Sequence, residues 1–251
     1  MALRSSDCWR IIFYEKEEAM QRTIPDPLAA GHRLRTVFPR RGEELIAALQ
    51  KENLNKKLLP SWREVQIIQL IKVVNLFAGD LTERYRERRI DALATTARNL
   101  AELCVWTQYC NVSEENAKTF FEDSARDFRD ILQSLQKLYT SVNGKPEEGL
   151  SEIIDKFQTA AVAHGMKDYD ERYVQVRDAA KEVGRLEAFN TIYKAFSKLA
   201  HPTSLILALD IRIGNLSGML DSLYVGGENF ASASLREIEK SIEKAYPSPT
   251  I

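Results

Sequence analysis

Residues 62–77 read WREVQIIQLIKVVNLF, and their apolar side chains recur at the spacing of an α-helix. Strict alternation of apolar and polar residues, which is typical of a half-buried strand, does not persist over any useful length of the sequence. The sequence therefore predicts an all-α fold. The apolar face expected of this first helix consists of Val65, Ile68, Leu70, Ile71, Val74 and Leu76.

Glycine and proline residues divide the rest of the chain into helical segments. Breaks are expected at Gly79, at the turn Asn143-Gly144-Lys145-Pro146, at Gly165 and at Gly226-Gly227. The resulting helices lie near residues 62–78, 81–110, 114–140, 150–164, 169–200, 203–224 and 230–245. They predict an antiparallel helical bundle of about seven long helices at residues 61–246, followed by a short tail at 247–251.

The first sixty residues have a different character, because residues 23–42, TIPDPLAAGHRLRTVFPRRG, hold three prolines and two glycines. We expect a short N-terminal helix, then an irregular arm, then a helix near residues 43–56. This arm either lies on the body as a loop or binds a partner, for example by exchange within a homodimer. It should also be poorly protected from proteases.

Two stretches are rich in arginine. Arg33, Arg35, Arg40 and Arg41 have no acidic residue among them, and they are the candidate anion-binding patch, for RNA or another acidic partner. Residues 82–91, TERYRERRID, interleave arginines with acids and are typical of a self-paired solvent face.

Composition restricts the classes of function. A chain of 251 residues with 44% hydrophobic content can bury a substantial core, and its 35 Lys and Arg nearly balance its 36 Asp and Glu. The residues Cys8, Cys104 and Cys110 form no CxxC pair, which favours free thiols in the cytoplasm. Cys104 and Cys110 should not be linked, because six positions along one helix turn their side chains to opposed sides.

We expect no targeting segment, no membrane span and no cofactor. The N-terminal residues reach acidic side chains before a signal-type apolar core is complete, and no stretch approaches the length of a span. The sequence lacks the GxxxxGK[ST], GxGxxG and HExxH motifs. His32, His164 and His201 are too scattered for metal ligands, so we expect no metal site.

One segment, TIYKAFSKLAHPTSLIL at residues 191–207, carries a row of polar side chains on an otherwise apolar helix. Tyr193, Ser197 and His201 are four positions apart and share one face. Pro202 should place His201 at the helix end. A histidine there can be held protonated by the helix dipole or serve as a hydrogen-bonded strut.

A second polar pair, Arg98 and Glu102, has i,i+4 spacing on another apolar helix. The pair is either an intrahelical ion pair at the edge of the core or one half of a network with Tyr193, Ser197 and His201. A fully buried network predicts that Arg98→Ala costs roughly 3 kcal/mol or more, against less than about 1 kcal/mol for an exposed pair.

The sequence ARNLAEL, with Arg98 and Glu102, and the sequence YKAFSKLAH, with Tyr193, Ser197 and His201, resemble the helical DUF5677 family of uncharacterised, mostly microbial proteins. The resemblance covers roughly Asp91 to Leu223 and implies that both polar sets belong to one site, without supplying an activity.

A looser resemblance connects such bundles to the HEPN superfamily, whose active members cut RNA without metal by means of an arginine and a histidine. The family's arginine is missing here, because Lys194, Ala195 and Phe196 occupy the positions at which it would fall before His201. Arg98 would have to replace it from the other helix.

Two functional readings follow. The first is a cytoplasmic helical module with a polar site between two long helices, for ligand or partner binding. The alternative is a metal-independent HEPN-like endoribonuclease in a toxin or phage-defence role, with His201 and Arg98 as catalytic candidates.

Overall fold

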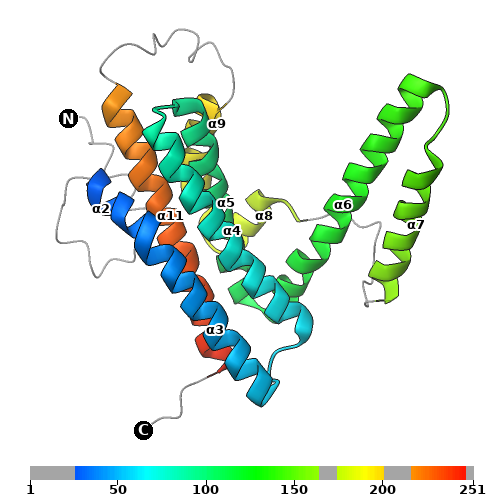
Figure 1. The fold of residues 1–251 in the computed structure, drawn as a ribbon, viewed down its shortest axis with the longest axis horizontal. Helices are drawn as coiled ribbons and strands as arrows, with labels where there is room; N and C mark the ends of the chain where they lie inside the picture. Colours follow the sequence, from blue (N-terminus) through cyan, green and yellow to red (C-terminus); the bar gives the residue numbers. More distant parts are fainter. Residues whose placement is uncertain (1–25, 164–173, 201–215, 247–251) are drawn as a thin grey trace. The chain divides into compact units, whose positions relative to one another are not determined.

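The computed structural model describes residues 26–163, 174–200 and 216–246 (Figure 1). Within these ranges the chain forms helices and no strand, which confirms the prediction of an all-α fold. The elements are α2 (Pro27–His32), the π-helical turn η1 (Arg33–Val37), α3 (Phe38–Lys56), α4 (Ser61–Arg86), α5 (Ile90–Val112), α6 (Glu114–Asn143), α7 (Glu148–Ala163), α8 (Val176–Glu182), α9 (Leu186–Ala200) and α11 (Leu216–Ala245).

The segment from Pro27 to Lys56 is helical throughout, so the prediction of an irregular arm is wrong for residues 27–42. Proline is tolerated in the first turn of a helix, and Pro27 opens α2 while the carboxylate of Asp26 accepts the amide of Leu28 at 2.9 Å. The π-helical turn η1 directly precedes the second such proline, Pro39, in the first turn of α3. The prolines therefore begin helical segments here instead of ending them.

Helix α4 is the centre of the larger compact unit, which holds the described residues up to Asn111 and those from Val176 onward. It contacts α3, α11 and η1, and Figure 1 shows α3 and α11 running opposite to it. Its buried face lies at the spacing of one helical stripe and consists of Ile67, Leu70, Ile71, Val74, Ala78 and Leu81. The prediction that Val65 and Leu76 belong to this face is wrong, because they are 49% and 67% exposed.

Two predicted glycine breaks are also wrong. Gly79 lies inside α4, which continues to Arg86, and Gly227 lies inside α11. A side chain at Gly227 would place its Cβ 2.7 Å from a methyl group of Leu81, so this glycine permits α11 to pack closely on α4. Gly144 ends α6 as expected, with a left-handed φ of 73°.

The expected helix at 169–200 is divided in the structure by a turn between α8 and α9, where Gly184 has a left-handed φ of 70°. Residues 164–173 and 201–215 lie outside the described residues, and with them Gly165 and the first part of the helix expected at 203–224.

Residues from Val112 to Gln175 form the second compact unit. Ser113 caps α6, its hydroxyl oxygen accepting the amide of Asn116 at 3.0 Å, and Glu114 and Glu115 follow it in the first turn. Helices α6 and α7 form a hairpin in which the Phe128 and Phe157 ring centroids are 4.6 Å apart. The extent of a single bundle domain at residues 61–246 stays a prediction.

Helix α4 is long and apolar enough to cross a membrane by length and composition. The expectation that no stretch approaches such a length is therefore wrong. Core helices of soluble proteins pass the same test. In this structure α4 packs against α3 and α11, and the buried guanidinium of Arg63 on α4 donates to the hydroxyl of Ser241 at 2.8 Å.

Candidate functional site

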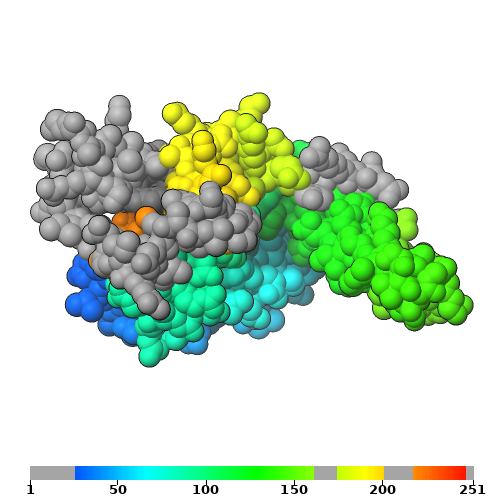
Figure 2. All heavy atoms as spheres, turned by 90° about the horizontal axis from the view of Figure 1, so that it is seen from above, coloured from blue at the N-terminus to red at the C-terminus, as the bar shows by residue number. Residues whose placement is uncertain are grey.

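Helix α9 carries the predicted row of polar residues next to a stripe that packs into the larger unit. The buried residues of this stripe are Phe189, Ile192, Phe196 and Leu199, at the spacing of one helix face. Phe196 meets Phe230 of α11 edge to face, with ring centroids 6.4 Å apart. Helices α8 and α9 form part of the surface seen in Figure 2. The stripe fixes the rotation of α9 and thereby the direction of its polar row.

Arg98 of α5 meets this row at Tyr193. Its guanidinium carbon lies 4.4 Å from the centroid of the Tyr193 ring, which is within the range of a cation–π interaction. On its own helix, the Nε of Arg98 donates to an Oε of Glu102 at 3.0 Å. The structure thus brings together three of the five predicted site residues, Arg98, Glu102 and Tyr193.

Ser197 follows Tyr193 by one turn of α9. Its hydroxyl oxygen is buried and has no hydrogen-bond partner within the described part of the chain. A buried hydroxyl without a partner is costly. His201, the last member of the predicted row, lies outside the described residues.

The Arg98–Glu102 pair is half buried, with side chains 22% and 25% exposed. This exposure lies between that of a fully buried network and that of an exposed ion pair. A pair of this exposure keeps contact with water. Arg98→Ala should therefore cost less stability than the roughly 3 kcal/mol expected for a fully buried network.

The four arginines of the candidate anion-binding patch lie on helices and are held by neighbouring groups. Arg33 forms two hydrogen bonds with the carboxylate of Glu228, at 2.8 and 3.0 Å, and this carboxylate is only 3% exposed. Arg41 pairs with Glu239 of α11, and both Arg40 and Arg41 bond Glu44.

Arg35 is exposed, and its Nε donates to the carbonyl of Gly31 at 3.2 Å. Three of the four charges are therefore balanced by carboxylates. Glu44, four positions after Arg40, could have been foreseen from its spacing, whereas the two acids of α11 are distant in sequence.

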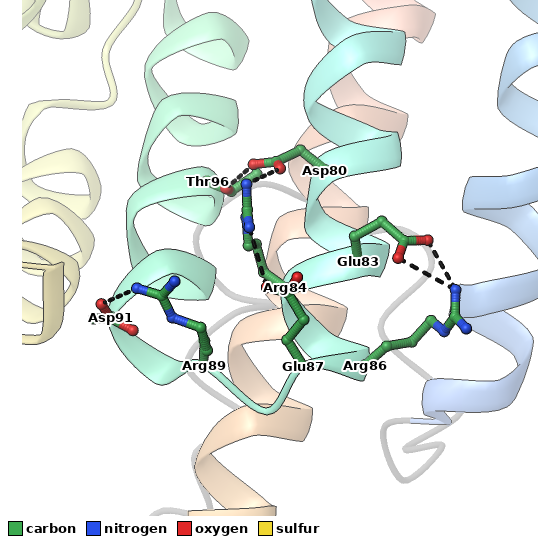
Figure 3. Close-up of polar contacts among 8 residues, drawn as sticks. All are labelled: Asp80, Glu83, Arg84, Arg86, Glu87, Arg89, Asp91 and Thr96. Atoms are coloured by element: carbon green, nitrogen blue, oxygen red, sulfur yellow. Dashed lines mark hydrogen bonds and ion pairs between the residues drawn. The ribbon is translucent and has the colours of Figure 1, made fainter.

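Three of the four arginines in the second arginine-rich stretch form ion pairs with acids close by in sequence, as predicted (Figure 3). Its ion pairs, with nitrogen–oxygen distances of 2.9 to 3.1 Å, are Arg84 with Asp80 and Glu87, Arg86 with Glu83, and Arg89 with Asp91. This surface offers few unbalanced charges to a partner.

Sequence reasoning missed two further polar sites. The Tyr85 hydroxyl donates to Asp221 at 2.5 Å, and its ring stacks on that of Tyr224 with centroids 4.1 Å apart. Burial and this hydrogen bond raise the pKa of Tyr85 to about 12. In the second unit, buried Arg126 donates to Asp123 at 2.6 Å, and burial raises the pKa of Asp123. The spacing of Asp123 and Arg126, three positions apart on α6, could have indicated the second pair. The partners of Tyr85 lie on α11, far away in sequence, so no local spacing indicates them.

Cys104 and Cys110 are free and buried, which confirms that they are not linked. Burial raises the pKa of each thiol to about 12, so neither is a nucleophile at neutral pH. Within the described ranges, no group of three or more His, Cys, Asp or Glu side chains could hold a metal ion.

The fold and the site define an all-helical protein with a half-buried polar cluster between α5 and α9. A family model, described as a family of unknown function (DUF5677), matches residues 80–215. The chain belongs to this family, as the two quoted motifs predict, and the matched region contains all five residues of the predicted site. Comparisons with curated proteins and with solved structures found no match.

Proposed function

We propose that this chain is a binding module whose site between α5 and α9 takes a polar, anionic ligand. The observation that carries the proposal is the setting of Arg98. Its guanidinium rests on the Tyr193 ring and is bonded through Nε to Glu102. A ligand anion can replace the Glu102 carboxylate at this guanidinium, because both present the same acceptor geometry.

Three other features support an anion. The Arg98 and Glu102 side chains are 22% and 25% exposed, so solvent reaches them. The buried hydroxyl of Ser197 lies one turn beyond Tyr193, and it could donate a hydrogen bond to a ligand oxygen only if binding exposes it. Lys194 and Lys198 are exposed on the same helix and add positive charge near the site.

The test uses fluorescence anisotropy of a labelled, mixed-sequence, single-stranded RNA, at low salt with EDTA, and inorganic phosphate as competitor. We expect saturable binding that Arg98→Ala weakens by at least about tenfold, equivalent to about 1.4 kcal/mol. Arg86→Ala is the matched control, since Arg86 is 65% exposed and also pairs within its own helix. Equal affinity of both variants, or no binding of RNA or phosphate, would overturn the proposal.

One observation favours the endoribonuclease as a second candidate. Arg98 contacts the Tyr193 ring on the helix whose sequence continues into His201. It could therefore supply the guanidinium that is missing at Lys194, Ala195 and Phe196. His201 would act as general acid or base, and Arg98 would stabilise charge on the phosphorus-bound oxygens.

Cleavage is tested by incubating mixed RNA with the protein in EDTA and separating the products on a denaturing gel. Fragments that disappear with both Arg98→Ala and His201→Ala would establish the nuclease. Intact RNA under conditions where RNA binds would leave a binding module without cleavage.

A further inference from the structure

Helix α6 carries a row of exposed, large apolar side chains. The exposed fractions are 38% for Phe128, 57% for Ile131, 46% for Leu135, 61% for Leu138 and 74% for Val142. These positions are separated alternately by three and four residues, which keeps them on one face of the helix. The same alternation of three and four is the a/d seam of a coiled coil.

The packing of α6 on α7 involves Phe128, whose ring meets that of Phe157, and leaves the other four residues of the row largely exposed. In the hairpin, the side-chain amide of Gln136 donates to the carbonyl of Glu147 at 3.0 Å and to the hydroxyl of Ser151 at 2.8 Å. Leu132 is the buried apolar residue in the same stretch of α6. The hairpin therefore presents an apolar face on α6.

We propose that a second copy of this chain docks on this face, so that two α6–α7 hairpins form a four-helix bundle in a symmetric dimer. A seam with the spacing of a and d positions is self-complementary, because each side chain fits between four residues of an identical facing helix. This inference is independent of the binding site proposed between α5 and α9.

The size of the face fits such a dimer. If a full large side chain presents about 200 Å², the five residues leave roughly 550 Å² of apolar surface exposed. A patch of this size lies at the upper end of the range of roughly 300–600 Å² for the largest apolar patch of a soluble monomer, and such patches are often functional. A standard interface buries about 800 Å² on each partner. The face alone thus supplies most of the area that a specific interface needs.

The charges beside the row also favour a like copy. The positions that flank the seam, in the sense of e and g of a heptad, are Ala125, Asp127, Leu132, Ser134, Tyr139 and Ser141. Only Asp127 is charged, so two identical seams meet without like charges in apposition. The flanking positions offer little opposite charge to a strongly charged partner.

The test is the mass of the full chain in solution, measured by light scattering and by sedimentation equilibrium over a range of micromolar concentrations. We expect a mass twice that of the 28.6 kDa chain. Leu138→Glu should return the protein to a single chain by placing a carboxylate within the seam. Leu76→Glu is the matched control, since Leu76 is a leucine of α4 with 67% exposure, and it should remain dimeric.

Circular dichroism of each variant shows whether its helices are kept. If Leu138→Glu loses helicity, Val142→Lys replaces it, because Val142 is 74% exposed near the end of α6. A wild-type protein that has the mass of one chain at every concentration would overturn the proposal. A dimer that persists with Leu138→Glu, or with Val142→Lys in its place, would also overturn the proposal.

Discussion

The contact between Arg98 and Tyr193 makes a quantitative prediction for a double-mutant cycle. Arg98→Ala removes a half-exposed cation–π contact worth about 1 kcal/mol and an i,i+4 ion pair worth about 0.5 kcal/mol. The two losses together predict a destabilisation of about 1.5 kcal/mol. Tyr193→Leu keeps an apolar side chain on α9 but removes the ring face on which the guanidinium rests.

The cycle compares the two single variants with the double variant by urea unfolding, followed by circular dichroism at a helical wavelength. We expect the losses to be non-additive by about 1 kcal/mol, because the cation–π contact is lost in either single variant and can be lost only once. Arg86→Ala, which breaks an ion pair with side chains 65% and 58% exposed, should cost less than about 0.5 kcal/mol.

Additive losses within roughly 0.5 kcal/mol would refute this reasoning. They would mean that Arg98 and Tyr193 do not interact in solution. The polar row of α9 would then be separate from the Arg98–Glu102 pair, which would remain an ordinary intrahelical ion pair.

Three further predictions concern buried groups. Burial raises the thiol pKa of Cys104 and Cys110 to about 12, so iodoacetamide at pH 8 should modify both only after unfolding in urea; modification in the folded protein, read by mass spectrometry, would contradict this burial. The pKa of Tyr85 is raised from 10.0 to about 12, so its contribution to stability is complete below pH 10 and is lost as the pH rises through 12. Tyr85→Phe should therefore flatten the fall in unfolding free energy between these pH values, and an unchanged slope would refute the shift. Arg33→Ala leaves the 3% exposed carboxylate of Glu228 without this cation, which should cost roughly 3 kcal/mol and speed tryptic cleavage of residues 27–42; cleavage as slow as in the wild type would argue against the ion pair.

The helical class of the fold was predictable because it depends on periodicity, which is a local property. The turn at Gly144 and the cap at Ser113 were also predictable, since their chemistry acts over four or five residues. Gly227 could not be interpreted in this way. Its role depends on Leu81, which lies on another helix and approaches too closely for any side chain larger than hydrogen.

The prolines show the same limit. Pro27 and Pro39 are signals for a break or for the first turn of a helix, and only the surrounding packing decides between the two. Ala30 and Leu34 are buried, and burial of these apolar side chains stabilises a continuous helix through this stretch. A sequence pattern alone does not show which side chains other helices will bury.

The candidate site was predictable in part. Spacing indicated the pair of Arg98 and Glu102 and the row containing Tyr193, and the structure brings these residues together. The acids that hold Arg33 and Arg41 were missed because Glu228 and Glu239 lie almost two hundred residues away in sequence. Charge patterns identify partners along one helix, but they do not identify partners across a bundle.

The most direct test of the proposed site follows the Nε–Hε resonance of Arg98 by nuclear magnetic resonance while single-stranded RNA is added in EDTA. This proton is donated to Glu102 across 3.0 Å in the free protein. Arg98→Lys assigns the signal by its disappearance. We predict a saturable shift of the Arg98 resonance with the signal of Arg86 unmoved, because a ligand anion displaces the Glu102 carboxylate. An Arg98 signal that stays in place while RNA binds would contradict a site between α5 and α9.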